Sequence, residues 1–536
     1  MRKQLLGPLL VLCILWGGLL TTGCLRADEK PTVRQPAVAG QFYPAQPDEL
    51  GKMVDGFLAA AAVPAMPERL VALIAPHAGY VYSGGVAAHS YKLLQPYALL
   101  KGQRFERVVV IAPSHFESFD FAAVFDGDAY ATPLGNVPVD KEFAAKLAKM
   151  SPLIKLSSRG HTPAGQQGEH SLEVQLPFLQ RVLGPFKLVP IVMGEQSYEA
   201  ERALGVALAK LLKGRTDTLI VASSDLSHFH SYDDASKMDH KTLKAIEQWD
   251  DLSLSENFES RVWEACGGGP IVTAMIAAHR LGANQAKVLK YANTGDVTGD
   301  HSRVVGYGAV ALIQAASRSA KSEPFTLNQK EKDILIELAK KAVETAVREH
   351  KSYEPAAPAS ESLLQERGAF VTLKEKGELR GCIGLTTARK PLYLTVRDAA
   401  TSAALRDPRF HPVTAVELPE LEYEISVLTP FRRVLDTTDI RVGRDGLLMI
   451  RGSSGGLLLP QVPTEQGWDR KTFLEETCHK AGLPPQAWQD EATDIFAFSA
   501  LVFSERKAPE PVMPHEPPSL KPKGPPGVRG PSSPQP

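Results

Sequence analysis

Three short apolar segments in the first half of the chain each run directly into a polar cluster. The segments cover 70–75, 107–112 and 219–222, and they are rich in β-branched residues, as is typical of strands buried in a parallel sheet. Each delivers a histidine just beyond its end, namely His77, His115 and His228. Because the carboxyl ends of parallel strands converge at one edge of a sheet, this pattern predicts a single shared site there.

Helical patterns separate these strands along the chain. Leucines at 172, 176, 179 and 183 fall on one helical face, and a helix is also expected after the glycines at 84–85 and over 200–212. Further apolar runs at 186–193 and 304–313 predict additional strands. The alternation predicts an α/β domain over 35–315, with a mainly parallel central sheet flanked by helices.

The pattern changes after a small and charged stretch, which predicts a linker over 316–327. A strongly amphipathic helix is expected at 329–349. Shorter apolar runs follow, typical of an antiparallel or mixed sheet, at 368–374, 379–384, 421–428, 446–451 and 456–460. We therefore predict an α+β domain over 328–507. Residues 508–536 are rich in proline, glycine and serine and are predicted to form a disordered tail.

Composition agrees with two globular cores. The chain has 536 residues, of which 43% are hydrophobic and 23% charged, and its formal net charge is -1. A balance this close to neutral gives no electrostatic footprint for nucleic acid, so no nucleic-acid partner is expected.

The amino terminus has the pattern of an export signal over 1–24. Arg2 and Lys3 precede the apolar run 5–20, which is shorter than a membrane-spanning helix. The sequence Thr-Thr-Gly-Cys at 21–24 resembles a bacterial lipobox, which predicts acylation of Cys24. The protein would then be an exported lipoprotein, anchored on the periplasmic or cell-surface face of a membrane by a tether over 25–34. A plain cleaved signal or an uncleaved anchor is the alternative.

His77, His115 and Cys266 form a candidate metal-binding set. Two imidazole nitrogens and one thiolate would leave room for water or substrate on the ion. Cys266 precedes Gly267-Gly268-Gly269-Pro270, interpreted as a flexible turn that allows close backbone approach. In the alternative interpretation, each histidine is hydrogen-bonded within its loop and the cysteine is a small buried hydrophobe.

Other residues are candidates for supporting chemistry. Asp225 could orient His228, so that the imidazole moves protons; alternatively Asp225 caps a helix and the histidine is exposed. Glu169 and His170 could line the same pocket, although capping of the following helix is favoured. In the second domain Cys382 lies between two glycines, where Arg380 could lower its pKa; a packed strand with a bulge is the alternative.

The first domain resembles the Memo family. The resemblance rests on several motifs in order: AVAGQFYP at 37–44, APHAGYVYSGG at 75–85, APSHF at 112–116, EHSLEVQLPFL at 169–179, SSDLSHF at 223–229, the Cys266 loop, and TGDVTGD at 294–300 before VGYGA at 305–309. That family is similar in structure to class III extradiol dioxygenases, which hold non-haem iron. The resemblance implies His77, His115 and Cys266 as metal ligands, and Asp225 and His228 as further pocket residues, with His228 as the acid/base group.

The second domain resembles the AMMECR family. It carries LRGCIG at 379–384 and longer matching stretches at 403–431 and 456–484. Together the two families define the AmmeMemoRadiSam system, whose third member, a radical SAM protein, is implied as a partner.

These observations lead to one main hypothesis. The protein is expected to bind a transition metal, iron with copper or zinc as alternatives, and to act as a redox or dioxygenase-like enzyme on a small molecule that the sequence does not identify. A metal carrier or redox buffer without turnover, and a ligand-binding module without metal, are the alternatives.

Overall fold

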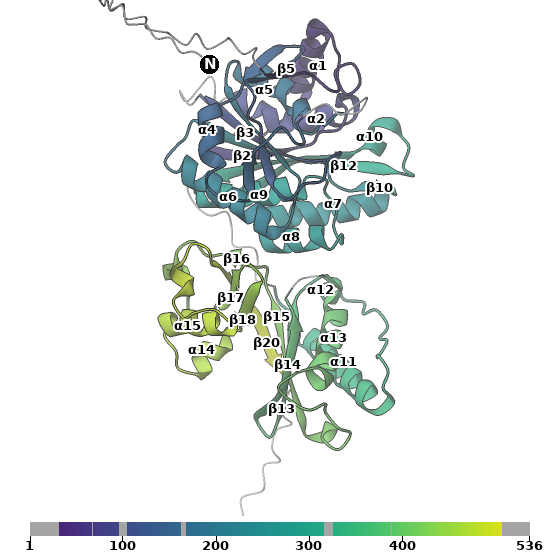
Figure 1. The fold of residues 1–536 in the computed structure, drawn as a ribbon. Helices are drawn as coiled ribbons and strands as arrows, with labels where there is room; N and C mark the ends of the chain where they lie inside the picture. Colours follow the sequence, from purple (N-terminus) through teal and green to yellow (C-terminus); the bar gives the residue numbers. More distant parts are fainter. Residues whose placement is uncertain are drawn as a thin grey trace, which may run out of the picture. The chain divides into compact units, whose positions relative to one another are not determined.

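The chain folds into two compact units, which divide between residues 320 and 321. The computed structural model describes residues 32–66, 68–95, 104–161, 168–315, 325–386 and 389–505. Figure 1 shows the elements of both units. In the part of the chain that the structure describes, every helix is too short or too polar to cross a bilayer.

A nine-stranded sheet forms the middle of the first unit. Its inner strands are parallel, in the order β2 (Arg69–Ala75), β9 (Thr218–Ser223), β3 (Arg107–Pro113) and β8 (Lys187–Met193). Antiparallel pairing begins at both flanks, with β12 (Val304–Gln314) beside β2 and β4 (Ala122–Val124) beside β8. The predicted α/β fold with a central sheet between helices is confirmed, and the antiparallel flanks make the sheet mixed.

Six further strands belong to the described part of this unit. Three of them complete the central sheet, and three form a small separate sheet. They are β10 (His228–His230) and β11 (Gln285–Asn293) beside β12, β7 (Ile154–Leu156) beside β4, and the separate sheet of β1 (Val33–Arg34), β5 (Ala129–Thr132) and β6 (Gly135–Pro138).

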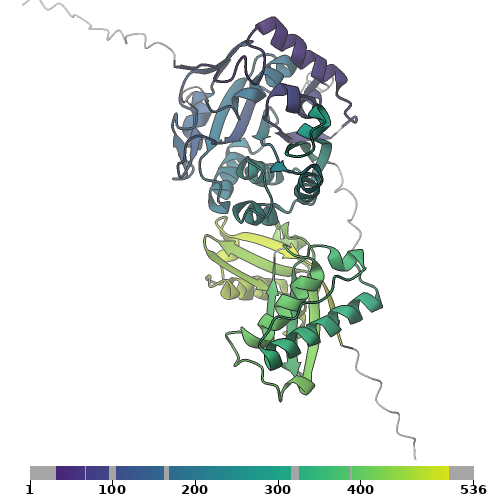
Figure 2. The ribbon, with the colours of Figure 1, turned by 90° about the vertical axis from the view of Figure 1, so that its right-hand side faces the viewer.

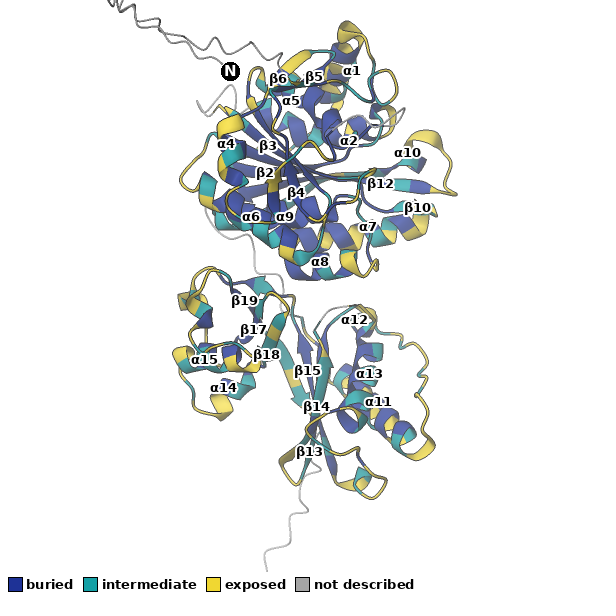
Figure 3. Cartoon of the chain, viewed as in Figure 1, coloured by how far each residue is buried: buried dark blue, intermediate teal, exposed yellow. Residues whose placement is uncertain are grey.

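Two hydrophobic cores lie on opposite faces of the central sheet. Val108 and Val110 point into one core, while Val109 and Ile111 point into the other, because successive side chains of a strand alternate between faces. The first core includes helices α1 (Pro47–Ala60), α2 (Tyr80–Lys92) and α5 (Leu176–Leu183). The second includes α4 (Lys141–Leu147), α6 (Tyr198–Leu212), α7 (Tyr232–Glu247), α8 (Asp251–Glu259) and α9 (Gly268–Arg280). The view turned by a quarter (Figure 2) shows these helices flanking the sheet, and the inner strands β2, β9, β3 and β8 are almost wholly buried (Figure 3).

The parallel pairing brings the ends of three predicted strands side by side. Ala75 at the end of β2 is in register with Ser223 at the end of β9, and Ala222 of β9 is in register with Ile111 of β3. The loops that follow carry His77, His115 and Asp225. They therefore leave the sheet from the same edge.

The second unit contains two antiparallel sheets of four strands, so the predicted α+β class is confirmed. The first sheet has the order β14 (Glu378–Leu385), β13 (Ala369–Glu375), β15 (Leu421–Leu428) and β20 (Ala500–Ser504). Helices α11 (Gln329–Glu349) and α13 (Leu392–Leu405) share a core with it. The second sheet consists of β16 (Arg432–Arg433), β19 (Asp494–Phe498), β17 (Gly446–Arg451) and β18 (Ser454–Leu458), and α15 (Arg470–Lys480) packs on it.

A buried ion pair fixes the start of the first unit. The Glu173 carboxylate accepts hydrogen bonds from the Arg34 guanidinium and the Tyr43 hydroxyl, and also from the backbone N–H groups of Ala37 at 2.7 Å and Val38 at 3.1 Å. Neither charged side chain is more than 2% exposed. The segment 37–43 is thereby held beside the sheet edge, where the Phe42 ring lies 4.5 Å from the ring of His170.

We expect Glu173→Ala to lower the free energy of unfolding of the first unit by about 3 to 5 kcal/mol, because it leaves the buried Arg34 charge without an acidic partner. Chemical denaturation followed by fluorescence measures this. Glu142→Ala, which breaks an exposed pair with Lys146, is the control and should have a much smaller effect. Equal effects of the two substitutions would contradict the assigned role of Glu173.

Candidate metal site

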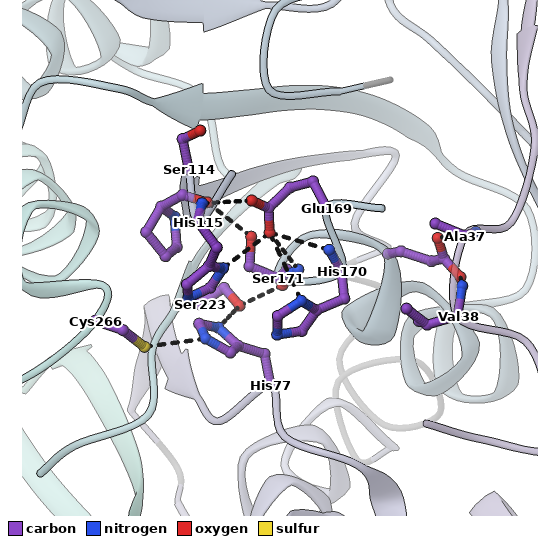
Figure 4. Close-up of polar contacts among 12 residues, drawn as sticks. Ala37, Val38, His77, Ser114, His115, Glu169, His170, Ser171, Ser223 and Cys266 are labelled. Atoms are coloured by element: carbon purple, nitrogen blue, oxygen red, sulfur yellow. Dashed lines mark hydrogen bonds and ion pairs between the residues drawn. The ribbon is translucent and has the colours of Figure 1, made fainter. Parts of the chain in front are cut away.

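His77 lies at the centre of the site, at the end of β2. Its ring is buried, and Figure 4 shows it between the Cys266 sulfur and the Ser223 hydroxyl. The distance from Nε2 to Cys266 Sγ is 3.0 Å, and that from Nδ1 to Ser223 Oγ is 2.8 Å. The two ring nitrogens therefore face different groups.

A chain of buried hydrogen bonds decides which nitrogen of His77 carries the proton. The Tyr91 hydroxyl donates to Gln175 Oε1 at 2.6 Å, so the amide nitrogen of Gln175 faces Ser223 and donates to its Oγ at 2.7 Å. The single proton of Ser223 is donated to the carbonyl oxygen of Ser171 at 2.5 Å. Ser223 can only accept from His77, so Nδ1 carries the proton and Nε2 presents a lone pair.

Glu169 orients the His115 ring in the same way, with Nδ1 toward an acceptor. The His115 ring donates from Nδ1 to Glu169 Oε1 at 3.0 Å, and the backbone N–H of His115 donates to Oε2 at 2.6 Å. The carboxylate also accepts from the backbone N–H groups of His170 and Ser171, each at 3.0 Å. A carboxylate behind a histidine fixes the ring tautomer and leaves Nε2 available to a metal.

The electrostatics of the site favour neutral imidazoles at His77 and His170 and one anchored carboxylate at Glu169. Burial and the neighbouring His115 hold the pKa of His77 well below its usual range. Burial and the neighbours His77 and His115 lower the pKa of His170 to about 3. Burial alone would raise the pKa of Glu169, but the hydrogen bond and charge of His115 keep it well below normal. Neutral rings suit metal coordination because their lone pairs are free.

Cys266 approaches the site from the start of α9. The backbone N–H of Asp225 donates to its sulfur at 3.3 Å, while burial and the Asp225 carboxylate raise the pKa of the thiol. A Cβ atom on Gly267 would lie 2.2 Å from the carbonyl oxygen of Ser223, so only glycine permits this approach. The prediction of a flexible turn over 267–270 is wrong for residues 268–270, because these residues form the first turn of α9.

The structure gathers potential ligand atoms in two groups that share His77. One group contains His77, His115 and His170, and the other contains His77, Asp225 and Cys266. Within each group the atoms lie within 4.8 Å of one another. The set expected from the sequence, His77, His115 and Cys266, spans both groups and is not one of these compact groups among the described residues.

Asp225 does not orient His228 by a hydrogen bond in the described part of the chain. Its carboxylate accepts instead from the backbone N–H groups of His77 at 2.7 Å and Ala78 at 3.3 Å, and burial raises its pKa. Asp225 therefore anchors the His77 loop. The His228 segment is held by Glu264, which accepts from the backbone N–H of His228 at 3.2 Å and contacts the His230 ring at 3.0 Å.

The remaining candidates lie elsewhere. Cys382 lies on β14 in the second unit, where burial raises its pKa and Thr372 donates to its sulfur at 3.2 Å. Arg380 does not activate it, because this guanidinium pairs with Glu417 at 2.7 Å. The packed-strand interpretation is therefore the better one for Cys382. Cys24 lies outside the described residues.

Sequence reasoning missed the groups that support the ligands. Gln175 and Glu264 were not singled out, Ser223 was named only as part of the polar cluster after its strand, and capping was favoured for Glu169. Glu169 does accept from the backbone N–H groups that follow it, but it also holds His115 in the site. The available signal was the density of polar residues in the stretches 169–175 and 223–230, which a buried strand-end site requires.

Comparisons with known proteins identify relatives of both units. The family described as Memo-like protein matches residues 34–311, and the family described as AMMECR1 matches residues 336–503. A MEMO1 family protein of Methanopyrus kandleri is 38% identical over 288 residues, covering 52% of this chain and 98% of the relative. Another, from Methanocaldococcus jannaschii, is 39% identical over 293 residues, covering 53% and 99%.

Among solved structures, an uncharacterized protein from Pyrococcus horikoshii matches with 43% sequence identity. The match covers 32% of this chain and 90% of that protein, with a TM-score of 0.32.

We expect His77 to be a neutral Nδ1–H tautomer in the metal-free protein at neutral pH, because Ser223 accepts from Nδ1. Nitrogen NMR of histidine-labelled protein distinguishes the tautomers. Ser223→Ala should abolish the preference at His77 and leave His115 unchanged, so that His115 serves as the internal control. An Nε2–H tautomer at His77 in the unsubstituted protein would refute the assignment.

Proposed function

This chain belongs to the Memo-like protein family, and an AMMECR1 domain follows later in its sequence. We propose that the first unit holds a non-haem iron site and acts as a dioxygenase-like or related redox protein. His77, His115 and Cys266 are the proposed ligands. His170 and Asp225 line the site beside them.

The observation that supports this proposal most directly is the orientation of the two imidazoles. Both rings donate from Nδ1 to fixed acceptors, so Nε2 is the nitrogen that each ring can offer to a metal, and the Cys266 sulfur lies 3.0 Å from Nε2 of His77. Histidines that bind a metal usually donate their other ring N–H to such an acceptor. Glu169 and Ser223 would act on the metal only through the rings that they hold.

The donor set narrows the choice of ion. Imidazole suits iron, copper and zinc, whereas a thiolate favours softer ions than the carboxylate that completes the usual non-haem iron triad. Iron is our proposal, with copper and zinc as the competing ions. When bound, iron would supply redox chemistry at a coordination position that the protein does not fill.

The residues around the ion have separate proposed tasks. His115 is the most accessible of the three ligands, with 26% of its side chain exposed, so substrate would enter from its side. Asp225 holds the His77 loop by accepting from two backbone N–H groups. His228 is the group proposed to move protons, and Glu264 keeps its short strand in place.

Metal analysis of the purified full chain tests the site. We expect about one ion per chain in the unsubstituted protein, and at least a roughly tenfold loss in His77→Ala and in Cys266→Ser, because each removes one ligand. Glu169→Gln should weaken affinity by roughly 10-fold to 100-fold while keeping all three ligands, because it loosens the His115 ring. His240→Ala removes an exposed histidine of α7 and should change nothing.

Equal metal content in the unsubstituted protein, His77→Ala and Cys266→Ser would refute the proposed ligands. Circular dichroism shows whether each variant is folded. Oxygen uptake with catechols and related substrates separates the functions: stoichiometric metal without uptake indicates a metal carrier or redox buffer. A metal-free protein that still binds a small ligand indicates a binding module.

We also propose that Cys24 carries a lipid that attaches the protein to the outer side of a membrane. The residues on which this rests are Gly23 and Cys24 after the apolar run 5–20. Labelling of bacterial cells with a radioactive fatty acid should mark the unsubstituted protein and Cys13→Ala, but not Cys24→Ala. Cys13 is the matched control because it lies in the same apolar segment. Label on Cys24→Ala would exclude this lipidation site.

A further inference from the structure

A cavity of about 650 Å³ lies in the second unit, far along the chain from the metal site. It is bounded by the end of α11, by one side of α13 and by the edge strand β14. All of its lining residues fall within 346–406, so the cavity belongs to the second unit alone. Its volume is in the range of small-molecule sites, roughly 300 to 1,000 Å³.

The wall of the cavity has an excess of positive charge. Four Lys or Arg side chains line it, against the single carboxylate of Asp398. That carboxylate is already shared between Lys390 at 2.7 Å and Arg397 at 2.8 Å, and Arg397 also pairs with Glu354 at 3.0 Å. The carboxylates of Asp398 and Glu354 therefore already pair with Lys390 and Arg397.

The other two cations, Lys351 and Arg406, have no acidic partner among the residues that the structure describes. They reach the cavity from different elements, Lys351 from just beyond α11 and Arg406 from just beyond α13. Two uncompensated cations facing one cavity create a positive potential in it, and an anion would be attracted there.

The position of Arg406 is fixed by its neighbours. Its backbone N–H donates to the carbonyl oxygen of Ser402 at 2.8 Å, which closes the last turn of α13. The next residue, Asp407, accepts from the backbone N–H of Cys382 at 2.8 Å and so ties the chain to the edge of β14. The stretch LRGCIG therefore has a second task besides forming a strand, because it anchors the backbone that carries Arg406.

The rest of the wall is mostly apolar or carries small hydroxyl groups. Its apolar members come from α11, β14 and α13 and are Ala346, Ile383, Leu385, Ala399 and Leu405. Thr401 and Ser402 of α13 and Ser352 add hydroxyl groups, and His350 adds an imidazole. A ligand that matches this wall has an acidic group at one end and an apolar body.

We propose that the second unit binds a small organic anion in this cavity, with its acidic group between Lys351 and Arg406 and its apolar body against Ile383 and Leu405. The class includes carboxylates, sulfonates and phosphate esters of modest size. This site is independent of the proposed metal site, since the two share no residue.

The test uses two dyes of nearly equal shape, the anion anilinonaphthalene sulfonate and neutral N-phenylnaphthylamine, with fluorescence titrations of the full chain. Lys351→Gln/Arg406→Gln should weaken binding of the anion by roughly tenfold and leave the neutral dye unchanged, because only the charge is removed. Lys376→Gln/Lys480→Gln removes two exposed charges elsewhere in the same unit and should leave both dyes unchanged.

A steric variant keeps the test decisive. Thr401→Trp fills the cavity without altering charge and should weaken the binding of both dyes. The proposal is overturned if the anion binds equally to Lys351→Gln/Arg406→Gln and to Lys376→Gln/Lys480→Gln. It is also overturned if Lys351→Gln/Arg406→Gln weakens the neutral dye as much as the anion, or if Thr401→Trp affects neither dye. Circular dichroism confirms that the compared variants are folded.

Discussion

The parallel pairing of β2, β9 and β3 is the constraint on which the first unit depends. It sets the register in which Ala75 lies opposite Ser223, and so places the His77 loop against the end of β9. Ser223 is the last residue of β9 and contacts the His77 ring, while Asp225 just beyond it contacts the backbone of the His77 loop. The strands therefore bring the loops together and also supply the groups that orient them.

A buried network of hydrogen bonds determines which nitrogen of His77 carries the proton. Tyr91 on α2, Gln175 before α5 and Ser223 on β9 form one chain of hydrogen bonds that ends at the His77 ring. Their donors are satisfied by the next member or by the backbone carbonyl oxygens of Pro76 and Ser171, which is what allows such groups to be buried. The outcome is a defined tautomer, and this requires three elements far apart in sequence.

The sequence predicted the fold class of both units because strands and helices follow hydrophobic periodicity, which is local. The helix at 329–349 and the strand at 421–428 coincide with α11 and β15. The antiparallel flanks were missed, because an apolar strand such as β12 has the same pattern in either direction. Strands β19 and β20 were also missed, since both are short and a single residue separates them.

Candidate site residues were predictable where they follow a strand, as do His77, His115 and Asp225. Their partners were not. Glu169 contacts His115 from 54 positions away, and Glu264 contacts His228 from 36 positions away. Spacing along the chain suggested instead that Asp225 would orient His228, although both groups meet other partners first. Such pairings depend on tertiary contacts that periodicity does not encode.

His77 belongs to both groups of potential ligand atoms, yet only one of its ring nitrogens has a lone pair to offer. One nitrogen cannot serve two ions, so an ion bound to His77 would draw its other ligands from one group or, as proposed, from His115 and Cys266 across both. The first group adds two imidazoles to His77, whereas the second adds a sulfur and a carboxylate. Ions that differ in hardness would therefore compete for His77 and settle toward different neighbours.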